Sequence, residues 1–169
     1  MTILIMLVAP IAGRSSDRFG SRWLMTSGMI LIAAQLLYFS RLGVEESYWR
    51  ILPAMILGGF GMSLVMTPSA AAAMRSLPVD NVGVGSAVLN AFRQVGGAMG
   101  IAVIGAIMAH EVGDLRGPGI FREKELFVDA FSTALTVAAL IAVLGAVVSF
   151  VLVRAHDRGP APEGVPEVV

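Results

Sequence analysis

The sequence predicts an all-α protein, a bundle of membrane-spanning helices, and three observations support this fold class. The 169-residue chain is 56% hydrophobic and only 14% charged, with a mean hydropathy of +0.80, whereas soluble domains carry about 25% charged residues. Four apolar segments each have about twenty residues or more, the length that an α-helix needs to cross a bilayer. None of them alternates apolar and polar residues in the way that strands of a membrane β-barrel do.

The first apolar segment, residues 1–12, is shorter than the four that follow. As a helix, Thr2 to Ala12 would cover about 16 Å, roughly half of the hydrocarbon core of a bilayer. No basic region precedes the apolar run and no clear cleavage site follows it, so a signal peptide is not indicated. We interpret residues 1–12 as the last half of a membrane helix. A short interfacial helix is the alternative, which the lack of a polar face disfavours.

A short basic loop, GRSSDRFGSR, joins residues 1–12 to the first full helix, expected over residues 23–42. Gly13 and Gly20 permit backbone conformations that other residues resist, which predicts a tight turn. Asp17 and the arginines are able to pair with one another or with nearby helix ends. A plain basic loop at the lipid headgroups is the alternative. The density of arginines indicates that this loop is cytoplasmic.

The second full helix is expected over residues 51–74, and small residues mark its middle. Gly58, Gly59 and Gly61 favour close packing against another helix. Pro68 lacks a backbone donor and predicts a kink. Two interpretations of that kink stay open: a part in gating, or an irregularity that the membrane helix tolerates.

The third full helix, expected over residues 84–108, carries three polar residues inside its apolar run: Asn90, Arg93 and Gln94. A charged side chain at the centre of a bilayer costs about 2.5–3.5 kcal/mol on insertion scales. Steps of three and four residues place all three on one side of a helix. We therefore predict a polar membrane interface, packed against something other than lipid.

Three glycines follow this polar cluster along the same helix: Gly96, Gly97 and Gly100. They would let another backbone approach closely, about one turn beyond Arg93. Two interpretations of Arg93 stay open. It pairs with carbonyls or a carboxylate of another helix and fixes packing, or it faces a central cavity or moving interface and changes partners.

The fourth full helix is expected over residues 130–153, and a proline-containing tail, residues 154–169, follows it. The tail is predicted to be disordered. With the loop of residues 13–22 inside the cell, four full spans place this tail on the cytoplasmic side as well.

Several function classes are not indicated by the composition. The chain has no cysteine and a net charge of zero, which supports neither a thiol-based site nor nucleic-acid binding. Its two histidines, His110 and His156, are far apart and lack ligand neighbours at helical spacing. The four full spans contain no His, Asp or Glu. We therefore expect no enzyme activity, no catalytic residue, no metal site and no cofactor.

The basic loop has the pattern G-x-x-x-D-R-x-G-x-R, and this pattern resembles the loop signature of the major facilitator superfamily. The matching positions are Gly13, Asp17, Arg18, Gly20 and Arg22. The resemblance implies a cytoplasmic loop between the second and third helices of a six-helix repeat. In that family the loop latches one half of the transporter against the other in the outward-facing state.

The segment from Pro78 to Gly100 is similar to the penultimate helix of fourteen-helix drug:proton antiporters. That subfamily shows P…G-x-x-S-G-x-x-N-x-x-R-Q-x-G-G-x-x-G, and this chain departs from it only at Ala87, where the pattern has glycine. The two resemblances imply that residues 1–153 form a partial C-terminal transmembrane bundle of a major facilitator fold. The fold would then comprise half a membrane helix plus four full transmembrane helices.

The resemblance implies efflux of amphipathic small molecules or drugs across the cell membrane by alternating access, coupled to protons. The implied partners are the lipid bilayer, a missing N-terminal half of the transporter, the amphipathic substrate, and protons whose site is not in this chain. We accordingly expect a fragment or a truncated open reading frame. The alternative is a small, non-transporting membrane protein that oligomerises or acts as an interaction module. No residue is singled out as substrate-binding.

Overall fold

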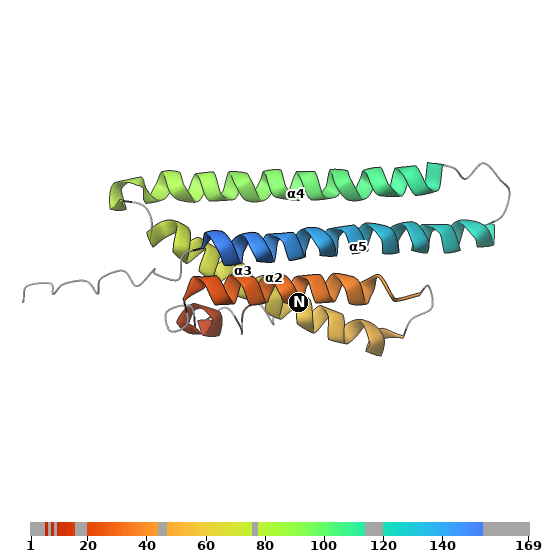
Figure 1. Ribbon diagram of the computed structural model, residues 1–169, viewed down its shortest axis with the longest axis horizontal. Helices are drawn as coiled ribbons and strands as arrows, with labels where there is room; N and C mark the ends of the chain where they lie inside the picture. The colour runs from red at the N-terminus through yellow and green to blue at the C-terminus, as the bar shows by residue number, and fades with distance from the viewer. Residues whose placement is uncertain are drawn as a thin grey trace, which may run out of the picture.

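The computed structural model describes residues 6, 8, 10–15, 20–43, 47–75, 78–113 and 120–153, and within these ranges it contains helices and no strand. Residues 6, 8 and 10–15 are helical, ahead of the longer elements. These elements are α2 (Ser21–Phe39), α3 (Tyr48–Arg75), the short 3-10 helix η1 (Val79–Asn81), α4 (Val82–Gly113) and α5 (Ile120–Leu152) (Figure 1). In the described part, four helices are long and apolar enough to cross a membrane. The expected all-α class is confirmed.

The helices do not end where the apolar segments end. Helix α2 stops at Phe39 rather than at residue 42, and the N–H of Ser40 closes its last turn on the carbonyl of Leu36 at 2.9 Å. Helix α5 begins at Ile120 rather than at residue 130. The added turns of α5 contain Arg, Glu and Lys, which are good helix formers but too polar for a hydrocarbon core. Hydropathy marks the part of a helix that lies in the membrane, and the helix itself continues past it.

Helix α2 packs against both α3 and α5 and runs antiparallel to each of them. At one end of the α2–α5 pair, Ser132 donates a hydrogen bond to the carbonyl of Ser40 at 2.6 Å. At the other end, the rings of Trp23 and Phe150 meet edge to face, with centroids 5.4 Å apart. These two contacts, one at each end of α2, fix the register of α5 along α2.

Small residues fill the core, because lipid leaves helices in a membrane to associate chiefly by close packing. The buried apolar residues of the spans are mostly alanines: Ala33, Ala54, Ala130, Ala134, Ala139 and Ala146. Buried Ser63 keeps its hydroxyl satisfied within its own helix by donating to the carbonyl of Gly59 at 2.9 Å. Helix α2 thus packs closely against α3 and against α5, whereas the described parts of α3 and α5 do not contact each other.

The backbones of α2 and α3 touch at a pair of glycines. A Cβ atom added to Gly28 would lie 2.8 Å from the carbonyl oxygen of Gly61, and one added to Gly61 would lie 2.9 Å from that of Gly28. Real Cβ atoms essentially never come so near, so neither position accepts a side chain without movement of a backbone. One turn away, a Cβ at Gly58 would collide with the amide of Gln35.

Helix α4 lies at the edge of the bundle, beside α5 and away from α2 (Figure 1). It contacts α5, and α3 to a smaller extent. No residue of its membrane-spanning part, Val82–His110, is buried. The helix that carries the polar cluster is therefore the one least covered by the rest of the chain.

Candidate functional site

Arg93 reaches from α4 to α3. Its Nη2 atom donates to the carbonyl oxygen of Met66 at 3.4 Å and to the hydroxyl oxygen of Ser69 at 3.3 Å. The Ser69 hydroxyl itself donates to the same Met66 carbonyl at 3.0 Å. Buried Pro68 lies between these two acceptors in the sequence, and α3 continues through it as one helix. Arg93 thereby contacts α3 beside Pro68, one of the two prolines of that helix that lack a backbone donor.

Both acceptors of Arg93 are electrically neutral. Its guanidinium has five N–H donors and a permanent charge, and within the described part of the chain only Nη2 has partners. No carboxylate forms an ion pair with it there, and the four full spans hold no Asp or Glu in their sequence. Most of the hydrogen-bonding capacity of Arg93, and all of its charge, is left without a counterpart among the described residues.

Asn90 lies about one turn before Arg93 in α4 and Gln94 directly follows it, and both side chains are exposed. Neither has a hydrogen-bond partner in the parts of the chain that the structure describes. An amide in a membrane needs such partners, because hydrocarbon supplies none. Together with Arg93 they form a polar surface, which we call the polar face of α4.

The three glycines beyond this polar face are open. A Cβ added to Gly96, Gly97 or Gly100 would meet nothing within 4 Å. The close approach that the sequence predicts at these glycines is not made by any described residue, so it stays a prediction. The structure does place Gly58 and Gly61 of α3 directly against α2.

The loop with the G-x-x-x-D-R-x-G-x-R pattern is described only in part, and Asp17 and Arg18 lie outside the described residues. Gly13 is helical, and a Cβ there would come within 3.8 Å of the Thr67 methyl group. Gly20 has φ 81°, a conformation that side chains with a Cβ rarely adopt. A glycine is therefore required where the chain enters α2.

Arg22, the last residue of that pattern, lies in the first turn of α2 and contacts α5. Its guanidinium carbon is 3.9 Å from the centroid of the Phe150 ring, a cation–π geometry. Trp23 meets the edge of the same ring. This cluster was not predicted from the sequence. The signal for it was present, because the start of α2 and the end of α5 must meet when antiparallel spans pack together.

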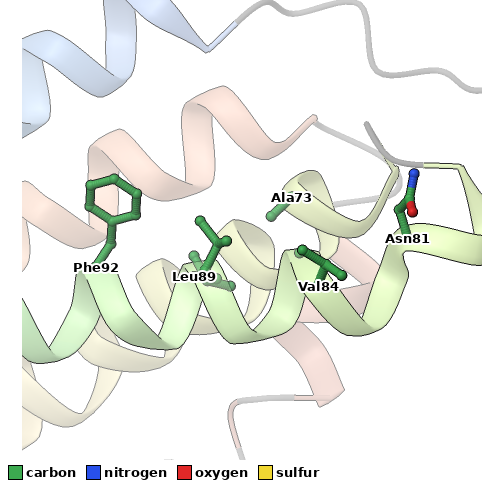
Figure 2. A pocket seen from close by; sticks show the side chains of 7 residues that line it. Ala73, Asn81, Val84, Leu89 and Phe92 are labelled. Atoms are coloured by element: carbon green, nitrogen blue, oxygen red, sulfur yellow. The ribbon is translucent and has the colours of Figure 1, made fainter.

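A hollow of about 550 Å³ lies between the end of α3 and the beginning of α4 (Figure 2). Its walls are largely apolar, with one amide among them; the lining residues are Ala73, Asn81, Val84, Gly85, Val88, Leu89 and Phe92. Asn81 and Phe92 lie toward opposite ends of it, and Leu89 and Val84 lie between them (Figure 2). Apolar walls with one polar group are typical of sites for small molecules. Sequence analysis could not find this hollow, because it depends on where α3 meets α4.

Comparison with known proteins gives a consistent family. The chain matches the family model described as Major Facilitator Superfamily over residues 1–168. It is 30% identical to the uncharacterized MFS-type transporter YcnB of Bacillus subtilis over 150 residues. The matched region covers 89% of this chain and 31% of that protein. It is 33% identical to a multidrug resistance protein B homolog of Mycobacterium tuberculosis over 134 residues. That matched region covers 78% of this chain and 23% of the relative.

A third relative is the tetracenomycin C resistance and export protein of Streptomyces glaucescens, 31% identical over 115 residues, with 68% of this chain and 21% of that protein covered. The chain thus spans about a fifth to a third of the length of these curated relatives. No solved structure matches the chain significantly.

Proposed function

Because this chain belongs to the major facilitator superfamily, we propose that it supplies the C-terminal membrane helices of an exporter of amphipathic small molecules. Two relatives carry names of multidrug resistance or of antibiotic resistance and export, which supports this substrate class. Alternating access is the proposed mechanism, in which two helical bundles rock around a site near the middle of the membrane. The remaining bundle is supplied by the rest of the transporter.

The observation that carries the proposal is the open polar face of α4. Polar side chains inside a membrane almost always face the interior of the protein or a wet cavity. Asn90, Arg93 and Gln94 are exposed in the described chain, so the interior that they require is formed with helices beyond it. The hollow beside Phe92 offers an apolar surface for the hydrophobic part of a substrate.

The loop of residues 13–22 is assigned the cytoplasmic latch, through Gly13, Asp17, Arg18, Gly20 and Arg22. The matching sequence pattern supports this assignment, as does Gly20, whose φ of 81° suits a sharp entry into α2. The loop and the C-terminus then lie on the cytoplasmic side of the cell membrane. Protons are the proposed coupling ion. Their titrating group is assigned to the rest of the transporter, because the apolar segments 23–42, 51–74, 84–108 and 130–153 carry no carboxylate.

A chimera tests the proposed function. Residues 1–153 replace the matching C-terminal segment of the YcnB transporter, and ethidium efflux is measured in everted membrane vesicles. The expected result is efflux that a proton-gradient uncoupler abolishes. The matched control is a chimera with Arg93→Gln, which is expected to reach the membrane in equal amount and to export at least tenfold less, since an intramembrane cation is a functional group. A correctly inserted chimera that exports none of several amphipathic cations would contradict the proposal.

An interaction module without transport activity is the second candidate, and the same uncovered helix α4 favours it. In that case the 169-residue chain alone would form stable oligomers through α4. Sedimentation of the purified chain in detergent distinguishes the two, because the exporter hypothesis expects a monomer that requires the rest of the transporter.

A further inference from the structure

We propose that the polar face of α4 is the docking surface for a membrane helix that carries an aspartate or glutamate at the depth of Arg93. The proposal rests on the proposed function in taking this helix to be part of the same transporter. It goes further by stating which chemistry the partner brings.

Charge is the first argument. Arg93 has a permanent positive charge, and its partners among the described residues, the Met66 carbonyl and the Ser69 hydroxyl, are neutral. A charge inside a membrane is stabilised best by an opposite charge that also accepts hydrogen bonds, and a carboxylate accepts two N–H bonds from a guanidinium side by side. The N–H groups of Arg93 that have no partner among the described residues are able to donate to a carboxylate.

The long distances to α3 are the second argument. Hydrogen bonds of 3.3 and 3.4 Å are longer than the usual 2.7–3.2 Å for N–H to oxygen. The contact with α3 therefore orients the guanidinium group but does not use all of its hydrogen-bonding capacity. Among the described residues only Nη2 makes such a contact, so Nε and Nη1 have no partner there and are able to donate to a second helix.

Backbone access is the third argument. Gly97 and Gly100 follow the polar face by one to two turns, and a Cβ at either would meet nothing within 4 Å. In the same chain, Gly28 and Gly61 have a backbone oxygen of the neighbouring helix within 3 Å of an added Cβ. The contact between Gly28 and Gly61 shows how closely two helix backbones approach where both have glycine. Gly97 and Gly100 leave comparable space for the partner helix, whose backbone would then pass beside them.

The amides complete the surface. Asn90 and Gln94 are exposed and have no partner among the described residues. They are able to bind the second carboxylate oxygen or the polar groups next to it. Lipid tails satisfy none of these groups, so the partner is a protein helix rather than acyl chains.

A synthetic helix tests the proposal without any transport assay. The probe is a Leu–Ala transmembrane peptide with one central Asp, and its isosteric control carries Asn at that position. Association of each fluorescent peptide with the labelled 169-residue chain is measured by energy transfer in phosphatidylcholine vesicles. We expect the Asp peptide to associate about tenfold more tightly than the Asn peptide, the size of effect seen for polar contacts between membrane helices.

Substitutions in the chain assign that preference to the docking surface. Arg93→Gln should remove the preference for Asp, whereas Arg93→Lys should keep part of it. Arg93→Glu should reverse the preference toward a peptide with central Lys. Gly97→Leu should weaken both peptides, whereas Val95→Leu, on the opposite side of α4, should change neither. Circular dichroism of each variant shows that the helices remain formed.

Two outcomes would overturn the proposal. One is equal association of the Asp and Asn peptides with the unsubstituted chain. The other is a preference for Asp that survives Arg93→Gln in a folded chain. Failure of efflux in the chimera would contradict the proposed function and leave the peptide result unaffected, so the two failures are distinguishable.

Discussion

The glycines of α3 and those of α4 have opposite surroundings. In α3, Gly58 and Gly61 face α2 so closely that any added Cβ collides with it. In α4, Gly97 and Gly100 face space in which an added Cβ meets nothing. Both helices show the same sequence signal, small residues near the middle of an apolar span. The difference teaches that this signal identifies a close-approach surface without identifying what occupies it.

The largest loss of stability is expected at the contact between Gly28 of α2 and Gly61 of α3. Gly61→Leu should reduce the free energy of unfolding by about 3 kcal/mol, because its Cβ would meet the Gly28 carbonyl and one backbone must move. Unfolding of the purified chain in micelles by added dodecyl sulfate measures this. Gly105→Leu is the matched control in α4, where a Cβ meets nothing within 4 Å. Equal losses at the two positions would break the comparison.

Gly58→Leu should cost less, about 2 kcal/mol, because the colliding group is the movable amide of Gln35 rather than a backbone. Shortening that side chain should recover part of the loss. The double variant Gln35→Ala, Gly58→Leu is therefore expected to be more stable than the sum of the single changes by at least about 0.5 kcal/mol. Additive losses would show that Gln35 does not limit the space at this position.

Phe150→Leu tests the contact between the end of α5 and the start of α2. It removes the ring that Arg22 and Trp23 both contact, and the expected loss is about 1 kcal/mol, in the range of a cation–π contact. The same unfolding titration measures it. Phe60→Leu is the control, because that partly exposed ring makes no aromatic or cation–π contact with the described residues. A loss no larger than the control's would mean that the cluster adds no stability.

The smallest effect on stability should be that of Gly97→Leu. In the isolated chain it should change the free energy of unfolding by less than about 0.5 kcal/mol, as expected for an uncovered position. In the chimeric exporter the same change should remove most ethidium efflux, because there a helix is expected to occupy the space. A large loss of stability in the isolated chain would show that the chain itself covers Gly97. The glycines of α3 and α4 would then have similar surroundings.

Much of the fold followed from the sequence, and particular residues show where prediction stopped. The apolar segments located all four spans, because hydrocarbon imposes one requirement on every residue in it. They could not locate Ile120 as the start of α5, since that turn extends past the apolar core. The spacing of Asn90 and Arg93 put both on α4, but only the packing reveals that Arg93 reaches Met66 and Ser69.

Gln35 shows why contacts between helices could not be predicted from the sequence. It is a single polar residue in an apolar run, and no role was predicted for it. Its contact with Gly58 appears only when α2 lies against α3. The hollow beside Phe92 likewise belongs to two helices at once. A single sequence gives the period of each helix, but it does not give which turns of two helices lie side by side.

The hydrogen bonds from Arg93 to α3 bear on the order in which the chain is made. Helix α3 leaves the ribosome before α4, so Met66 and Ser69 precede the arginine into the membrane. The span that holds Arg93 has a mean hydropathy of 1.5, against 2.7 for that of α5. Insertion of α4 is therefore expected to cost more than that of α5. Two acceptors for its arginine lie on a helix that precedes it. We therefore expect the earlier placement of α3 in the membrane to lower the free-energy cost of inserting α4.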